Sequence, residues 1–231
     1  ESIDIEEMET IVNTREVRQR ALQIRQELGQ PKTLVHGVDR LDYTKGIQHR
    51  LNAYRELLSE GRLTTPETVL VQVATPSRER VEHYARLREN VEREVGSING
   101  EFAQVGAPAV HYLHQSYSRS ELAALYLAAD VMAVTPLRDG MNLVAKEYVA
   151  ARTDNGGALV LSEFAGAARE LRQAYMCNPH DINSIKRALM RAVEADPGTA
   201  PRRMQAMRRY LRDHGGRQWA AGFLSALGAT T

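Results

Sequence analysis

The sequence predicts an α/β fold with a doubly wound parallel sheet. Apolar segments of strand character alternate with amphipathic helical segments along most of the chain. The strand candidates are apolar throughout, as is typical of parallel strands covered by helices on both faces. With 231 residues, 43% hydrophobic and 26% charged, the chain is long enough for one domain with a sizeable core. We therefore expect a single domain over 1–231, ending in helices over about 199–228.

The first predicted elements are a helix, a strand and a second helix. The first helix is expected over about 14–28, where apolar residues recur at helical spacing before Gly29 and Pro31 end it. A strand follows over 33–38. The next helix presents one apolar face, formed by Ile47, Leu51, Tyr54 and Leu58.

The middle of the chain continues the alternation. A strand over 68–74 leads to a charged helix from about Arg78, whose later part is expected to be interrupted at Gly96 and Gly100. A strand over 109–113 and a helix over 119–129 precede another strand over 131–134. The next helix is expected to begin near Met141 or Asn142.

The last third predicts two strands and several helices. The strands are expected over 158–161 and 174–178, and between them the small residues around Gly166 are expected to permit close backbone packing. Helices are predicted from Asp181, near Pro201 and near Gly216. We find no internal repeat or low-complexity linker, so nothing divides the chain.

The segment 134–150, VTPLRDGMNLVAKEYVA, joins a strand to a helix. Gly140 is expected to supply the flexible turn between them. The first N–H groups of a helix lack intrahelical partners, and together with the helix dipole they attract an anion such as a diphosphate. Helical side chains lean towards the N-terminus, so the Glu147 carboxylate is expected to reach a ribose beyond the helix start. Asp139, on the turn, is expected to orient sugar hydroxyls.

A second motif, VDRLDYTKG at 38–46, places Arg40 and Lys45 in a strand-to-helix loop. In an open parallel sheet, ligands bind at the carboxyl ends of the strands, where this loop and the loop 135–141 should both emerge. Two fixed cations and a helix start would then face one point. Such a cluster repels itself unless an anion, such as a nucleoside diphosphate, is present.

Each of these charged residues also has an ordinary interpretation. Asp139 would be a helix N-cap, Glu147 a solvated surface acid, and Arg40 and Lys45 solvated loop charges. Each interpretation suffices for one residue alone. The two motifs together favour a site.

The segments DRLDYTKG at 39–46 and RDGMNLVAKEY at 138–148 are similar to two motifs of the trehalose-6-phosphate synthase family. The resemblance extends from about 33 to 228. It implies a retaining glycosyltransferase of GT-B architecture, in which two Rossmann-like domains face each other across a cleft. This chain would be the carboxyl-terminal, donor-binding domain, and the amino-terminal acceptor domain would lie outside it. The implied reaction transfers glucose from UDP-glucose, or a related nucleotide sugar, to glucose 6-phosphate.

The resemblance also implies roles for individual residues. Arg40, Lys45 and Asp139 would be catalytic, and Arg78 would reach the phosphate of the acceptor. Tyr117 would lie beside the base, although many family members carry phenylalanine there, which leaves the base preference open between uracil, guanine and adenine. The complete donor-binding set would be Arg40, Lys45, Val73, Tyr117, Asp139, Gly140, Met141, Asn142, Leu143, Val144 and Glu147, with Val73 contributing backbone contacts.

Composition excludes several other classes of function. The net charge of +1 gives no global field for binding nucleic acid or membranes. Cys177, the only cysteine, excludes an internal disulfide and a cysteine metal cluster, and its neighbours suggest a buried apolar position. A lone histidine such as His36 is interpreted as a core residue with its hydrogen bonds satisfied. No histidine or acid pattern predicts a metal site, so we expect no metal and no cofactor besides the donor substrate.

Location and assembly are less constrained. No apolar run is long enough to cross a bilayer and no leader is recognisable, so we expect a cytoplasmic protein. The chain opens at Glu1 inside a charged segment, and we expect it to be a domain of a longer protein. The oligomeric state stays open, with a homo-oligomer among the possibilities.

The predicted function is therefore metal-independent transfer of glucose with retention, giving trehalose 6-phosphate and UDP. One alternative is a related synthase with another acceptor, such as a glucosylglycerol-phosphate synthase using glycerol 3-phosphate. The other is a non-catalytic nucleotide-sugar binding module. The chain alone is expected to bind nucleotide without turnover, because half the cleft would be absent.

Overall fold

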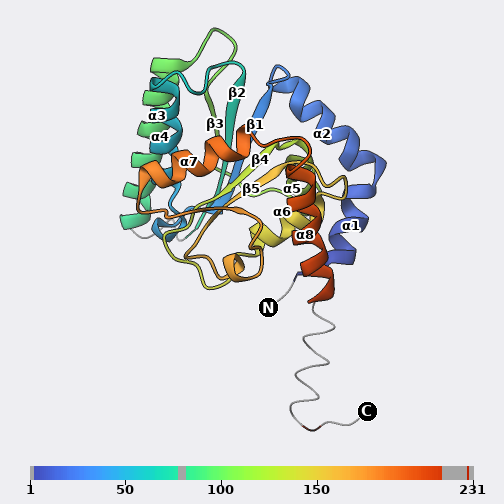
Figure 1. Ribbon diagram of the computed structural model, residues 1–231. Coiled ribbons are helices and arrows are strands. Elements are labelled where there is room, and N and C mark those ends of the chain that lie inside the picture. Colours follow the sequence, from blue (N-terminus) through green and yellow to red (C-terminus); the bar gives the residue numbers. More distant parts are fainter. Residues whose placement is uncertain (1–2, 78–81, 215–227, 229–231) are drawn as a thin grey trace.

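The protein contains one parallel sheet in the order β3-β2-β1-β4-β5-β6 (Figure 1). The computed structural model describes residues 3–77, 82–214 and 228. All neighbouring strands in the sheet run parallel. This order is the one found in Rossmann-type sheets, and it confirms the predicted doubly wound fold. The strands are β1 Thr33–Arg40, β2 Thr68–Thr75, β3 Val110–Leu113, β4 Val131–Val134, β5 Ala158–Ser162 and β6 Tyr175–Cys177.

Helices cover both faces of the sheet, and each face has its own core (Figure 1). One core forms beneath α1 Ile5–Asn13, α2 Arg15–Glu27, α5 Arg119–Ala128, α6 Leu143–Ala151 and α8 Ala200–Asp213. The opposite core forms beneath α3 Ile47–Ser59, α4 Glu82–Phe102 and α7 Ile182–Val193. Two short 3-10 turns, Tyr43–Lys45 and Gly166–Arg169, lie in loops that follow β1 and β5.

Two details differ from the sequence-based expectations, and one expected helix is not tested. The helix α1 was not expected, and Thr14 separates it from α2 by capping the latter through the N–H of Val17. The expected interruption of α4 is wrong: the helix passes through Gly96 and Gly100, and its buried residues hold it against the sheet despite about 1 kcal/mol of lost propensity per glycine. The helix expected near Gly216 lies outside the described residues.

The sheet divides at its centre, between β1 and β4. Strand β1 pairs with β2 over its full length, but its register with β4 covers only Val35–Val131 and His36–Met132. Beyond that point the guanidinium of Arg50, from α3, donates to the carbonyl of Ala133 in β4 and, at 2.5 Å, to the carboxylate of Asp39 in β1. Arg50 is 1% exposed. A buried cation therefore bridges the two strands where the strand order reverses.

Gly37 makes room for this bridge. A Cβ atom at position 37 would lie 3.0 Å from the guanidinium carbon of Arg50 and 2.5 Å from Oε1 of Gln72. The Gln72 amide in turn donates to Asp39 at 3.4 Å. Parallel strands that diverge at a reversal of order create the crevice in which α/β proteins bind ligands. The polar cluster thus fixes the width of the crevice at the edge where the two sequence motifs emerge.

Candidate functional site

The loops after β1 and β4 are joined at the carboxyl edge of the sheet. The N–H of Leu137 donates to the carbonyl of Thr44 at 2.7 Å. Gly46 adopts a left-handed conformation with φ of 65°, and a Cβ atom there would lie 2.1 Å from the carbonyl oxygen of Thr135. Only glycine allows this approach without displacing the neighbouring backbone. The expected convergence of the two motifs is confirmed.

An ion pair also crosses between the loops. The ammonium of Lys45 donates to Oδ2 of Asp139 at 2.6 Å, and both side chains are 15% exposed. Burial raises the pKa of Asp139, but the hydrogen bond and charge of Lys45 outweigh this and lower its pKa below the ordinary value. The alternative in which Lys45 is a solvated loop charge is therefore wrong. The convergence of the two loops was predicted, but the pairing of individual side chains across them was not, so Asp139 was not recognised as the partner of Lys45.

Arg40 lies at the end of β1 rather than in the loop that follows it. Its side chain is exposed, and it makes no hydrogen bond or ion pair with another residue that the structure describes. The predicted strand was two residues too short, because two adjacent charged residues, Asp39 and Arg40, did not indicate a continuing strand. Arg78, the expected ligand of the acceptor phosphate, lies outside the described residues.

Asn142 is the N-cap residue of the helix α6, whose first helical residue is Leu143. Its side-chain oxygen accepts from the N–H of Ala145 at 3.0 Å, and its backbone is left-handed with φ of 64°. Asp139 instead accepts from the N–H of Met141 at 3.3 Å. The alternative in which Asp139 is the N-cap is therefore wrong. The expectation that Gly140 supplies the flexible turn is also wrong, because the left-handed residue before the helix is Asn142. Asparagine tolerates left-handed geometry because its short side chain bonds to the nearby backbone.

Glu147 is tied to the neighbouring helix. Its Oε2 atom accepts from the hydroxyl of Tyr126, in α5, at 3.0 Å. Burial raises the pKa of Glu147, although the Tyr126 hydrogen bond and the charge of Arg119 oppose the change. Glu147 is thus no solvated surface acid. The partner Tyr126 was missed because the helix 119–129 is apolar in pattern, which hides the one polar atom of a buried tyrosine.

The two positions expected near the base lie on the other half of the edge. Val73 is fully buried in β2 between Val38 and Leu113, and its carbonyl accepts from the amide of Gln72 at 2.9 Å. Tyr117 is half-buried in the segment before α5, and its hydroxyl accepts from the amide of Gln115. Their positions agree with the expected placement, and their roles remain predictions.

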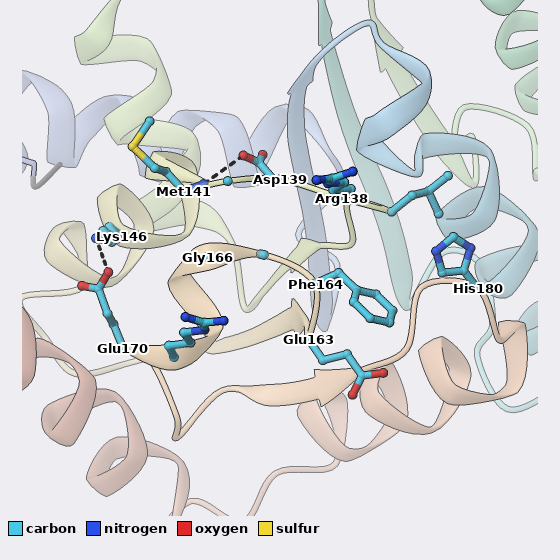
Figure 2. A pocket seen from close by; sticks show the side chains of 13 residues that line it. Arg138, Asp139, Met141, Lys146, Glu163, Phe164, Gly166, Glu170 and His180 are labelled. Atoms are coloured by element: carbon cyan, nitrogen blue, oxygen red, sulfur yellow. Dashed lines mark hydrogen bonds and ion pairs between the residues drawn. The ribbon is translucent and has the colours of Figure 1, made fainter.

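A cavity of about 670 Å³ opens beside Asp139 (Figure 2). The residues 137–141 line one wall, and residues 163–170 line another. Figure 2 shows Phe164 beside His180, whose ring centroids are 5.7 Å apart, and Lys146 paired with Glu170 at 2.7 Å. Phe164, His180 and Glu170 were not expected at the site, since no motif in the sequence marks them.

Main-chain contacts fix the walls of this cavity. The N–H of Gly166 donates to the carbonyl of Asp139 at 2.9 Å, and the N–H of Ala167 donates to the carbonyl of Met141 at 2.8 Å. A Cβ atom at position 166 would lie 2.0 Å from the carbonyl oxygen of Gly140. The predicted close packing at Gly166 is therefore confirmed. Of the expected site residues, Asp139, Gly140 and Met141 line the cavity, whereas Arg40, Lys45 and Glu147 are not among its lining residues.

Other chemistry-bearing groups lie away from this edge or are inert. Burial raises the pKa of the Cys177 thiol to about 12, which confirms its role as a buried apolar residue. Among the described residues no three His, Cys, Asp or Glu side chains are grouped so as to hold a metal ion. Within the same residues, no helix has the length and apolarity needed to cross a membrane.

The sequence matches the model of glycosyltransferase family 20 over residues 2–229. It is 60% identical over 229 residues to the trehalose-6-phosphate synthase of Mycolicibacterium smegmatis, covering 99% of this chain and 46% of that protein. The synthase from Mycobacterium sp. (strain JLS) is 59% identical and is covered to 47%. The chain thus spans about half the length of the curated relatives it matches.

Solved structures show the same fold. One is an alpha,alpha-trehalose-phosphate synthase (UDP-forming) from Burkholderia xenovorans in complex with glucose-6-phosphate, with a TM-score of 0.92 and 38% identity over 98% of this chain and 50% of that one. Another is an E. coli protein bound with UDP-2-fluoro glucose, with a TM-score of 0.91 and 36% identity over 100% of this chain and 51% of that one. The expected fold class, one half of a GT-B glycosyltransferase, is confirmed.

Proposed function

The chain belongs to glycosyltransferase family 20, and on that premise we propose that it is the donor-binding half of a trehalose-6-phosphate synthase. The whole enzyme would transfer glucose from UDP-glucose to glucose 6-phosphate with retention at the donor carbon. One observation carries the proposal: the loop bearing Lys45 and the loop bearing Asp139 are joined at the start of α6, at the edge where the strand order reverses. This is where parallel α/β proteins bind nucleotides.

The diphosphate would be held by positive charge and by free amides. Arg40 and Lys45 supply two cations, and the N–H groups of Leu143 and Val144 come before the first capped amide of α6. Lys45 would exchange its bond to Asp139 for a bond to the diphosphate. Asp139 would then be released to orient the hydroxyls of the glucose, together with the backbone at Gly140 and Met141 and the Asn142 side chain.

The nucleoside would extend towards β3. Glu147 accepts only one hydrogen bond from the described residues, so it retains acceptor capacity for ribose hydroxyls. Tyr117 would contact the base, and the backbone of Val73 would contribute. In this proposal the base, ribose, diphosphate and glucose would follow one another along one edge of the sheet.

The proposed chemistry depends on stabilising the leaving group. As the bond from the anomeric carbon to the diphosphate breaks, negative charge develops on the phosphate oxygen, and Arg40, Lys45 and the α6 amides would stabilise it. The acceptor hydroxyl attacks from the same face, and its proton passes to that phosphate oxygen. The proposal needs no protein nucleophile, metal or cofactor.

The acceptor would bind mainly to the half of the enzyme outside this chain, with Arg78 reaching its phosphate. The alternative of glycerol 3-phosphate as acceptor remains a competing proposal for the same donor half. Comparing the products of the full-length enzyme with glucose 6-phosphate and with glycerol 3-phosphate separates the two. Formation of glucosylglycerol phosphate in place of trehalose 6-phosphate would contradict our assignment.

Calorimetric titration of the chain with UDP, GDP and ADP tests donor binding. We expect UDP to bind, and the full-length enzyme but not the chain to form trehalose 6-phosphate. A folded chain, shown by circular dichroism, that binds none of the three nucleotides would contradict the donor-half proposal. Transfer catalysed by the chain alone would contradict the proposed division of the active site.

A further inference from the structure

Tyr126 is a fully buried tyrosine whose ring is fixed on two sides. It lies in α5 with 0% exposure. Its ring centroid is 6.2 Å from that of His36 in β1, and also 6.2 Å from that of Tyr148 in α6, which meets it edge-on at 81°. With its ring held by packing, the hydroxyl has little freedom to choose a partner.

The hydroxyl of Tyr126 donates to Oε2 of Glu147 at 3.0 Å, and this is its one hydrogen bond among the described residues. A neutral phenol has one proton to donate, so Oε2 is the oxygen that is held. The other oxygen, Oε1, accepts no hydrogen bond from a described residue. A carboxylate offers about four acceptor positions, which leaves room for two further donors.

This arrangement differs from that of Tyr148, a second fully buried tyrosine on the adjoining helix. The Tyr148 hydroxyl donates to the carbonyl of Ala129 at 3.5 Å, within the core of the domain. Among the described residues, its hydroxyl makes no hydrogen bond to an acid. Tyr148 thus serves as a structural counterpart to Tyr126, with the same side chain, the same burial and a different partner.

The Glu147 carboxylate is partly buried, which increases the value of each hydrogen bond that it accepts. Burial raises the pKa of this carboxyl, which shows that its charged form is incompletely solvated. A carboxylate in such a place gains more from each new donor than one in water. The two hydroxyls of a ribose are such donors, and they are able to reach Oε1 only if the carboxylate keeps one orientation.

We propose that Tyr126 is a positioning residue that holds Glu147 in the orientation required to bind the ribose of the donor. The inference rests on the proposed function, because it takes Glu147 as the ribose ligand. Tyr126 fixes one carboxylate oxygen from beneath, and the ribose hydroxyls bind the other. The residue thereby determines how strongly the enzyme distinguishes a ribonucleotide from a nucleotide that lacks both hydroxyls.

The experiment compares UDP with 2′,3′-dideoxy-UDP on the full-length enzyme, with dissociation constants measured by calorimetry. The ratio of the two constants reports the ribose contact. Tyr126→Phe should weaken UDP binding about tenfold and leave dideoxy-UDP binding unchanged, so that the ratio falls by the same factor. The matched control, Tyr148→Phe, should keep the wild-type ratio.

A second measurement separates positioning from a loss of structure. In a Glu147→Ala background, adding Tyr126→Phe should have no further effect on UDP binding, because there is no carboxylate left to position. The proposal is overturned if Tyr126→Phe keeps the wild-type ratio or weakens both ligands equally. If Glu147→Ala itself keeps the ratio, the assignment of Glu147 in the proposed function fails, and the role of Tyr126 fails with it.

Discussion

The ammonium of Lys45 and the carboxylate of Asp139 are 2.6 Å apart, and they join the two loops on which the proposed chemistry depends. Each of these two charged residues therefore has its partner on the other loop. The pair gives Lys45 a fixed position and keeps Asp139 ionised, since Lys45 lowers the pKa of that acid against the effect of burial. A diphosphate must therefore compete with a carboxylate for the same cation.

Removing the negative charge of Asp139 should change UDP binding and turnover in opposite directions. In the full-length enzyme, Asp139→Asn should tighten UDP binding about threefold to tenfold, because Lys45 is released and a like charge is lost near the diphosphate. Turnover should fall, because the amide cannot orient the glucose hydroxyls in the same way. Calorimetry and steady-state kinetics measure the two effects. The control is Glu170→Gln, which removes an acid that lines the same cavity but pairs with Lys146. It should not tighten UDP binding. Weaker UDP binding by Asp139→Asn would show that Asp139 does not compete with the diphosphate for Lys45.

Arg40 should contribute to the transition state. We expect Arg40→Ala in the full-length enzyme to lower kcat about 100- to 1,000-fold, as for the loss of one donor that stabilises an oxyanion. Arg62→Ala removes another exposed arginine, from the loop before β2 at the opposite edge of the sheet, and should leave kcat unchanged. An unchanged kcat for Arg40→Ala would remove that residue from the mechanism.

The contact between Gly46 and Thr135 should be intolerant of any side chain. Gly46→Ala adds a methyl group 2.1 Å from a carbonyl oxygen and should cost more than about 3 kcal/mol in the free energy of unfolding. The control is Gly61→Ala, whose φ of 67° is equally strained but whose methyl group meets open space. It should cost about 1 kcal/mol in a urea titration. Equal losses for the two variants would show that the contact between the loops is unimportant.

The buried guanidinium of Arg50 should be far more costly to remove than an exposed one. Arg50→Met leaves the charge of Asp39 buried without its partner, and we expect a loss of about 3–5 kcal/mol in the free energy of unfolding. Arg55→Met, on the same helix, breaks surface ion pairs in which the arginine side chain is 37% exposed, and it should cost far less than Arg50→Met. A similar cost for both variants would contradict the role given to Arg50 at the division of the sheet.

His36 should make the stability of the domain depend on pH. Burial lowers the pKa of His36 from 6.5 to about 4, with the charge of Arg50 adding to the effect and the hydrogen bond to Val71 opposing it. At pH values between about 4 and 6.5, His36 is protonated in the unfolded chain but stays neutral in the folded chain. The contribution to stability is therefore complete above pH 6.5 and is lost as the pH falls towards 4, by on the order of 3 kcal/mol in total.

Urea titrations of the chain at pH 7.5 and pH 5.0 measure this dependence. His36→Gln, whose amide is able to donate to the Val71 carbonyl, should lose about 2 kcal/mol less than wild type between these two conditions. His83→Gln replaces an exposed histidine of α4 and should behave as wild type. If all three proteins lose the same stability, His36 is not the group responsible.

The sequence predicted the sheet and most of its helices because their signals are local. Apolar runs such as Val131–Val134 and capping residues such as Asp181 act within one element, so their outcome does not depend on distant residues. The helix α1 was missed because only Thr14 separates it from α2, and a cap in the middle of a charged helical segment resembles a solvated threonine.

The candidate site was predicted by residue type but not by partner. The motifs identified Lys45, Asp139 and Glu147, yet the Lys45–Asp139 and Glu147–Tyr126 contacts connect residues 94 and 21 positions apart in the chain. Such pairs depend on how helices and loops dock, which sequence spacing does not encode. His36 shows the same limit, since its Nε2 atom is buried without a partner among the described residues, contrary to the expectation of satisfied hydrogen bonds.

The main-chain bonds between residues 139–141 and 165–167 have a practical consequence for engineering. Because backbone atoms rather than side chains hold the cavity beside Asp139, the frame should persist when Met141 or Phe164 is exchanged for a larger or smaller residue. Gly166 is the exception, because any side chain there would strike Gly140. A library that varies those two wall positions and keeps the glycine is thus a direct way to change which sugar the proposed donor site accepts.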